Sequence, residues 1–185
     1  MSLLSCYAND IIKPMKEKTI SKNLIFKGKV FTVYDDDVKL PDGSISHREV
    51  LDHSGGVCIL AQIEDEVLMV RQYRYAVGKE MLELPAGKLE KNENPLPAAV
   101  RELQEETGYQ AGKMISLGSF IPTCGYCNEV IYMFKAEDLT FVGQNLDPTE
   151  FLSVERVKIK DLKTMIANNE IQDAKTIVLC YKAEI

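Results

Sequence analysis

Residues 87–109 read GKLEKNENPLPAAVRELQEETGY, and this stretch decides the fold of the chain. Asn94 followed by Pro95 predicts a helix start, because asparagine caps the free N–H groups of a first turn and proline has no N–H to leave unpaired. Gly108 predicts the helix end, where glycine readily adopts the left-handed conformation. The apolar residues between these signals recur at helical spacing, and we expect them to face a core: Leu96, Ala99, Val100 and Leu103.

Three acidic residues share this helix. Glu102 and Glu106 project within about 40° of each other on the flank of the apolar stripe, and Glu105 lies beside them on the wetter side. Like charges at this spacing cost a helix roughly 0.2–0.5 kcal/mol per pair. Two interpretations are open: a solvated acidic face, or a site for a hard divalent ion, which prefers oxygen ligands.

The spacing around these acids favours the ion site. Gly87, five residues, Glu93, seven residues, Arg101-Glu102-Leu103, one residue, Glu105-Glu106, one residue and Gly108-Tyr109 together resemble the Nudix box at every defined position. The resemblance implies an α/β/α sandwich with a mixed sheet. It also implies hydrolysis of a nucleoside diphosphate linked to another group, with Mg²⁺ as the cofactor and Mn²⁺ as its substitute.

The resemblance also implies the metal ligands. Glu102 and Glu106 match the family's metal carboxylates, and the main-chain carbonyl of Ala86 is a further oxygen ligand. Glu105 completes the set, directly or through water, and shares in catalysis. The remaining matched positions are structural: Gly87, Glu93, Arg101 and Gly108, among which Glu93 and Arg101 are expected to form an ion pair that braces the loop against the helix.

The general base is expected in an acidic loop before a late strand, here DPTEFLSV. The alignment of FLSVERV with that strand places Glu150 at the matching position. Pro148 occupies one position where an acid often stands, which leaves Glu150 as the base and Asp147 as the fallback. The alternative for Glu150 is an ordinary solvent-exposed loop glutamate.

Substrate selection is implied by the run RQYRYAVGKEMLELPAG, which resembles the stretch before the box in ADP-ribose pyrophosphatases. Arg74 matches a residue that contacts the diphosphate, for which a planar guanidinium is suited, and Glu83 matches one that reads the adenine side. PTCGYCNE resembles the PSPGF-x-x-E loop of the same branch, with Glu129 in register. Cys124 replaces the proline that marks this branch, and Tyr126 stands where tyrosine marks diadenosine polyphosphate hydrolases.

Residues 19–51 are strand-like, with a hairpin signal at Pro41-Asp42-Gly43. They resemble the N-terminal antiparallel sheet through which ADP-ribose pyrophosphatases pair two subunits, which implies a homodimer. Arg48 matches an arginine that reaches the substrate across the dimer, and Lys29 stands where a family member places an aromatic residue against adenine. We therefore expect residues 1–52 to be an N-terminal arm and dimerisation sheet, and residues 53–185 to be the hydrolase domain.

The rest of the chain predicts a mixed sheet flanked by helices. GVCILAQIEDEVLMVRQYR predicts two strands joined at Glu64-Asp65, with apolar runs typical of strands buried on both faces. MLELPAGKLE, MISLGSFIPT, VIYMFKAEDL and FLSVERVKI predict further strands. IKDLKTMIANN and AKTIVLCYKAEI predict helices, and residues 1 to about 18 an arm or short helix.

Composition excludes several classes of protein. The net charge of −6 argues against sequence-independent nucleic-acid binding, which needs a basic surface. No apolar run reaches the ~18 residues of a transmembrane helix, and MSLLSCYANDIIKP lacks the features of a signal peptide, so a cytoplasmic location is expected. The five scattered cysteines indicate reduced thiols. For Cys124-x-x-Cys127, metal binding, redox chemistry and simple loop packing are open, and loop packing is favoured.

The leading hypothesis is therefore an enzyme that hydrolyses ADP-ribose to AMP and ribose 5-phosphate. A hydrolase acting more broadly on nucleotide sugars, dinucleoside polyphosphates or damaged nucleotides would use the same residues. A non-catalytic ADP-ribose sensor is disfavoured, because it predicts a degraded box, whereas every defined position is present.

Overall fold

The computed structural model describes residues 15–185, which form two compact units. One unit comprises the chain up to His53 together with Gly125–Cys127, and the other comprises Ser54–Cys124 and Asn128–Ile185. The arm or short helix expected at the N-terminus falls largely on residues 1–14, outside the described part, as does Cys6. Among the described residues, no helix has the length and apolar character needed to cross a membrane.

The smaller unit is a four-stranded antiparallel sheet in which β3 pairs with each of the other strands: β1 (Lys18–Ser21), β2 (Leu24–Lys27), β3 (Phe31–Lys39) and β4 (Ile45–His53). The predicted hairpin is confirmed between β3 and β4. Gly43 takes a φ of 93°, which glycine tolerates, and Asp42 Oδ1 accepts hydrogen bonds from the N–H and hydroxyl of Ser44. The N–H of Leu51 donates to the carbonyl of Tyr126, which attaches Gly125–Cys127 to this unit.

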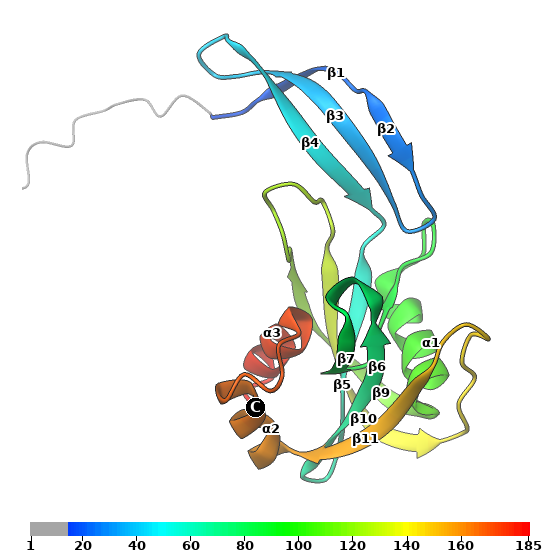
Figure 1. The fold of residues 1–185 in the computed structure, drawn as a ribbon. Helices are drawn as coiled ribbons and strands as arrows, with labels where there is room; N and C mark the ends of the chain where they lie inside the picture. Colours follow the sequence, from blue (N-terminus) through cyan, green and yellow to red (C-terminus); the bar gives the residue numbers. More distant parts are fainter. Residues whose placement is uncertain (1–14) are drawn as a thin grey trace, which may run out of the picture. The chain divides into compact units, whose positions relative to one another are not determined.

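The larger unit is built on a seven-stranded mixed sheet with the order β11-β6-β5-β10-β9, in which β7 pairs with β6 and β8 with β5 (Figure 1). β10 runs parallel to β5, and the other pairs are antiparallel. Its elements are β5 (Gly56–Ile63), β6 (Glu66–Arg74), the 3₁₀ turn η1 (Tyr75–Val77), β7 (Lys79–Glu83), β8 (Ala86–Lys88), β9 (Tyr109–Phe120), β10 (Ile131–Phe141), β11 (Leu152–Lys158), α1 (Pro95–Thr107), α2 (Ile159–Ala167) and α3 (Ala174–Lys182).

Central strand β5 has a core on each face, as its apolar run predicted. Val57, Ile59 and Ala61 pack with buried residues of α1, whereas Cys58 and Leu60 pack with buried residues of α2 and α3. The alternation follows from the two-residue period of a strand. Helices thus cover both faces of the sheet, with α1 on one side and α2 and α3 on the other (Figure 1), and the predicted sandwich is confirmed.

Helix α1 begins and ends as predicted. The side chain of Asn94 accepts a hydrogen bond from the N–H of Leu96, and Gly108 takes a φ of 78°. One part of the prediction is wrong: Leu96 is 46% exposed and Val100 is 39% exposed. The buried apolar face instead consists of Ala98, Ala99 and Leu103.

Candidate active site

Two acidic side chains of α1 are buried against strand β8. Glu102 is 8% exposed and Glu106 is 3% exposed, whereas Glu105 on the next position of the helix is half-buried. Carboxylates are seldom buried unless a partner compensates their charge. Their burial therefore argues against the solvated acidic face that was the alternative interpretation.

Gly87 makes room for one of these acids. A Cβ atom added at Gly87 would lie 1.8 Å from Cδ of Glu102 and about as close to both of its carboxylate oxygens. The requirement for glycine comes from this close approach and not from an unusual backbone angle. Strand β8 and helix α1 thus hold the Glu102 carboxylate directly against the main chain.

Glu106 is anchored to the neighbouring residue of β8. Its Oε2 accepts a hydrogen bond of 2.9 Å from the N–H of Ala86. Burial is the main cause that raises the pKa of Glu106 to about 8; the Ala86 hydrogen bond and the charge of Arg74 act to lower it, and the negative charges of Glu102 and Glu150 act to raise it. Burial also raises the pKa of Glu102. The protein alone therefore resists having both carboxylates charged, and a bound cation would relieve this.

Arg101 links the box loop to the helix. Its guanidinium donates to both oxygens of Glu93, at 3.2 and 3.0 Å, and its Nη1 donates to Glu102 at 2.7 Å and to Glu105 at 2.9 Å. The carboxylate of Glu93 also accepts the N–H of Glu90. The ion pair between Glu93 and Arg101 is thus present, and Arg101 additionally neutralises part of the acidic helix face.

The donor set suits a hard divalent ion. It offers the carboxylates of Glu102, Glu105 and Glu106 together with the nearby carbonyl of Ala86, all of them oxygen donors. Within residues 15–185, however, no three acidic, histidine or cysteine side chains already converge in the geometry of a formed metal site. In this structure Arg101 and the Ala86 N–H hold the carboxylates.

The loop after β10 returns to the same carboxylates. Its start is fixed on α1, because Gln144 donates to the carbonyl of Glu106 and the N–H of Asn145 donates to the carbonyl of Glu105. The charge of Glu150, later in this loop, contributes to the raised pKa of both Glu102 and Glu106.

Asp147, the fallback base, is engaged within its own loop. Its Oδ1 accepts from the N–H and hydroxyl of Thr149, and these hydrogen bonds lower its pKa. A carboxylate with its proton affinity reduced in this way is a poorer base than an ordinary aspartate.

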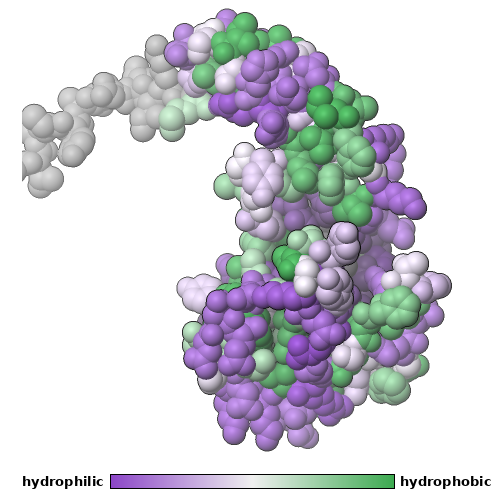
Figure 2. All heavy atoms as spheres, in the orientation of Figure 1, coloured by the Kyte–Doolittle hydropathy of each residue, from purple (hydrophilic) through white to green (hydrophobic). Residues whose placement is uncertain are grey.

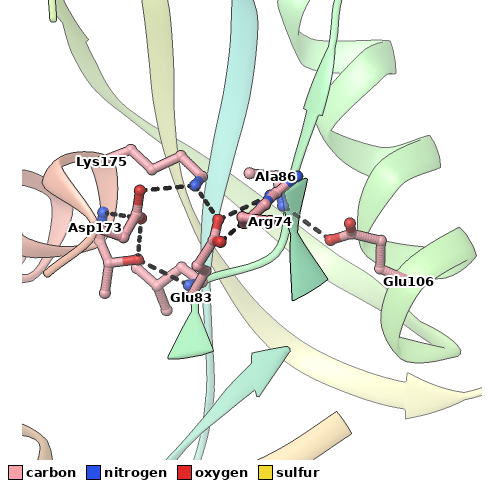
Figure 3. A network of polar contacts seen from close by, with 8 residues as sticks. Arg74, Glu83, Ala86, Glu106, Asp173 and Lys175 are labelled. Carbon is pink, nitrogen blue, oxygen red and sulfur yellow. Dashed lines mark hydrogen bonds and ion pairs between the residues drawn. The ribbon is translucent and has the colours of Figure 1, made fainter. Parts of the chain in front are cut away.

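A cluster of four charged residues lies beside the carboxylates, and we call it the Arg74–Lys175 cluster: Arg74, Glu83, Asp173 and Lys175 (Figure 3). Arg74 grips Glu83 with two hydrogen bonds, Nε to Oε1 at 2.7 Å and Nη2 to Oε2 at 2.8 Å. The ammonium of Lys175 donates to the same Oε2 and to Oδ1 of Asp173. Burial raises the pKa of Glu83, but the two cations outweigh it and the pKa is lowered.

The sequence analysis missed Asp173 and Lys175. The available signal was Asp173 as the N-cap of α3, where its Oδ2 accepts from the N–H and hydroxyl of Thr176. Lys175 follows in the first turn of the same helix, where a lysine is slightly unfavourable beside the positive end of the helix dipole, but this alone does not indicate a role. Its partner Glu83 lies far away in the sequence and could not be identified.

The other predicted substrate residues are distributed over both units. Glu129 lies in the larger unit just before β10, half-buried. Lys29 and Arg48 belong to the smaller unit, where Arg48 donates to both oxygens of Glu17, at 2.9 and 2.5 Å. Of the two cysteines of the C-x-x-C pair, Cys124 belongs to the larger unit and Cys127 to the smaller one.

The raised pKa of Glu106 predicts a pH-dependent stability. Between the ordinary glutamate pKa of 4.5 and about 8, the folded protein without metal keeps a proton that the unfolded chain has released. Stability should therefore fall as the pH rises through this window. We expect the melting temperature in EDTA to drop between about pH 5 and pH 8, and the drop to be smaller in Glu106→Gln. An added divalent ion should raise the melting temperature more at the higher pH. If the melting temperature of Glu106→Gln fell with pH as steeply as that of the wild type, Glu106 would not be the group responsible for the pH dependence.

Comparisons with known proteins identify relatives of this chain. The NUDIX domain model matches residues 52–180, and the model of the nucleoside diphosphate sugar hydrolase N-terminal domain matches residues 17–51. The chain is 41% identical to the ADP-ribose pyrophosphatase of Bacillus subtilis (strain 168) over 168 residues, which cover 89% of this chain and 91% of the relative. It is 39% identical to the methanol dehydrogenase activator of Bacillus methanolicus over 169 residues, or 90% and 91% of the two chains.

A solved structure shares the fold. The crystal structure of an ADP compounds hydrolase superposes with a TM-score of 0.81 at 20% sequence identity, covering 91% of this chain and 92% of the other.

Proposed function

The chain belongs to the Nudix family, and we propose that it hydrolyses the diphosphate bond of ADP-ribose to give AMP and ribose 5-phosphate. The observation that carries the proposal is the burial of Glu102 and Glu106 against Ala86 and Gly87, with the charge of Arg74 acting on Glu106 beside them. Such a site combines cation ligands with a phosphate-binding group. The ADP-ribose pyrophosphatase of Bacillus subtilis, which matches most of the chain, supports the choice of substrate.

Nudix hydrolases depend on divalent metal ions, and we propose Mg²⁺, with Mn²⁺ as its substitute, for this chain. Glu102, Glu106, Glu105 and the Ala86 carbonyl would hold the metal. Bound there, it would neutralise the diphosphate and lower the pKa of a water molecule.

The chain's own residues have separate tasks in this proposal. Arg74 binds the diphosphate, because a guanidinium pairs well with phosphate oxygens. Glu150 accepts the proton of the attacking water; the anchoring of the start of its loop on α1 and the effect of its charge on Glu106 support this role. Glu83 and Lys29 stay predictions as contacts on the adenine side, and Glu129 stays a prediction as a substrate-binding residue.

The test is an assay of the purified protein on a panel of substrates: ADP-ribose, other nucleotide sugars and diadenosine polyphosphates, each with Mg²⁺ and with EDTA. We expect the highest kcat/KM for ADP-ribose and no turnover in EDTA. The match to the nucleoside diphosphate sugar hydrolase N-terminal domain gives a broader nucleotide-sugar hydrolase as the second candidate. A preference for diadenosine polyphosphates, which Tyr126 marks, would reject the proposed substrate.

Glu150→Gln should lower kcat by about 10²-fold and change KM by less than about threefold, because a general base acts mainly in the transition state. Steady-state kinetics on the best substrate measures both constants. Asp147→Asn is the matched control in the same loop, and it should lower kcat much less. A variant in which only KM rises would identify Glu150 as a binding residue.

We further propose that the protein is a homodimer formed through the smaller unit. Its hydrophobic side chains gather over the β2–β3 end of the sheet (Figure 2), where five are exposed: Leu24, Ile25, Phe26, Val30 and Phe31. Exposed apolar surface of this kind marks interaction sites. The cytoplasmic location stays a prediction.

In such a dimer, Arg48 is proposed to reach the partner's diphosphate. Its pair with Glu17 is exposed, and exposed pairs contribute little, so the arginine can exchange partners. Arg48→Ala and Glu106→Gln homodimers should each be nearly inactive. If equal amounts are mixed and subunits exchange randomly, about half of the dimers are heterodimers, and each has one intact site of two. Mixing should therefore restore up to about one quarter of wild-type activity. No recovery despite proven subunit exchange would mean that Arg48 does not serve the partner's site.

A further inference from the structure

The role of Lys175 is not explained by the metal chemistry. Its side chain is only 17% exposed, and it lies on α3, on the face of the sheet opposite the carboxylate helix α1. A buried ammonium group loses its hydration and must be compensated by paired charges. Here Asp173 and Glu83 compensate it and keep its pKa above the ordinary value despite burial.

Anchoring of α3 does not require this lysine. The cap of the helix uses Asp173 Oδ2, which accepts from Thr176, and the hydroxyl of Thr176 in turn accepts the N–H of Leu84 at 2.9 Å. These hydrogen bonds already join α3 to the chain after β7. Lys175 also balances the charges of Glu83 and Asp173, but charge balance alone does not require that it donate to the carboxylate that pairs with Arg74. The contact between Lys175 and Glu83 therefore calls for a further explanation.

That explanation is the orientation of Arg74. The bidentate pair with Glu83 uses Nε and Nη2 and fixes the plane of the guanidinium, while Nη1 makes no hydrogen bond among the described residues. Arg74 lies between Glu83 and the Ala86–Glu106 contact (Figure 3). The terminal torsion of a glutamate is broad, so Glu83 needs a donor from a second residue, besides Arg74, to hold its carboxylate in one plane. Lys175 is that donor.

We propose that Lys175 is a positioning residue for the substrate: it holds the Glu83 carboxylate in the orientation that grips Arg74, and so fixes the guanidinium before the diphosphate binds. The inference rests on the proposed function, in which Arg74 contacts the diphosphate. Glu83 then acts through Arg74. Its carboxylate oxygens accept three hydrogen bonds, two from Arg74 and one from Lys175.

The test compares Lys175→Met with the wild type by steady-state kinetics and thermal melting. We expect KM to rise about tenfold and kcat to change by less than about threefold, because a preset binding group is lost in the ground state and transition state alike. Lys175→Arg should recover most of the affinity.

Lys79→Met is the matched control: Lys79 also joins β7 to the segment before α3, through Gln172, but is exposed and does not touch Glu83. Its KM should match the wild type.

Two further variants separate positioning from charge balance. In an Arg74→Ala background, Lys175→Met should raise KM by less than about twofold, because the two residues act as one unit. The double variant Asp173→Asn/Lys175→Met leaves Arg74 balanced against Glu83, so it removes the uncompensated charge that could prevent Lys175→Met from folding. Its KM should still be raised about tenfold.

Three results would overturn the inference. The first is an unchanged KM in Lys175→Met, and the second is a wild-type KM in Asp173→Asn/Lys175→Met. The third is a roughly tenfold rise of KM when Lys175→Met is added to Arg74→Ala. The substrate panel with wild-type protein is run first, and the kinetics use the substrate that it hydrolyses best. A failure of ADP-ribose as substrate is thereby distinguished from a failure of Lys175 as a positioning residue.

Discussion

Glu106→Gln is expected to reduce hydrolysis by about 10²-fold or more while leaving the protein folded, because the variant loses a charged metal ligand and with it several kcal/mol of transition-state stabilisation. The fold should tolerate the change well. Glutamine has nearly the same shape, and its amide oxygen can accept the N–H of Ala86 as Glu106 does. Burial already raises the pKa of Glu106 to about 8, so the neutral side chain resembles the protonated form that the metal-free protein prefers.

The measurement is kcat and KM over a Mg²⁺ titration, with melting temperature as the check on folding. Glu137→Gln is a suitable control, because Glu137 is a carboxylate of strand β10 that, within residues 15–185, forms its ion pairs with Lys113 and Lys135. It should show wild-type kinetics. Near-normal turnover of Glu106→Gln at saturating Mg²⁺ would reject Glu106 as a metal ligand.

The fold was predictable wherever the signals were local. The start and end of α1 follow from Asn94, Pro95 and Gly108, which act within one turn of the helix. The burial of its apolar face was less predictable. Helical period defines a stripe, but the sheet decides which residues of the stripe it covers: α1 lies against β5 and β8 through the small side chains Ala98 and Ala99.

The candidate site was likewise predictable only where its residues lie close together in the sequence. Glu102 and Glu106 are four residues apart on one helix, so their proximity is a property of the sequence. The Arg74–Lys175 cluster is not: Lys175 and Glu83 are 92 positions apart and meet only because α3 packs on the sheet beside β7. A lysine near a helix start is usually a solvated surface charge, and only its burial reveals a different role.

Gly87→Ala is expected to abolish most of the activity, by about 10²-fold, at little cost in stability. The added Cβ would lie 1.8 Å from Cδ of Glu102, so the Glu102 carboxylate must leave its position. A displacement of about 1 Å at a catalytic group can reduce the rate by about 10²-fold. The three nearest atoms all belong to the end of the flexible Glu102 side chain, so the fold can relax by turning Glu102 outward. Kinetics and thermal melting in Mg²⁺ test this, and Gly112→Ala, whose Cβ would meet Asp138 at 3.0 Å, controls for adding a methyl group to a strand. Wild-type kcat/KM in Gly87→Ala would show that the position of Glu102 against the main chain is not required for catalysis.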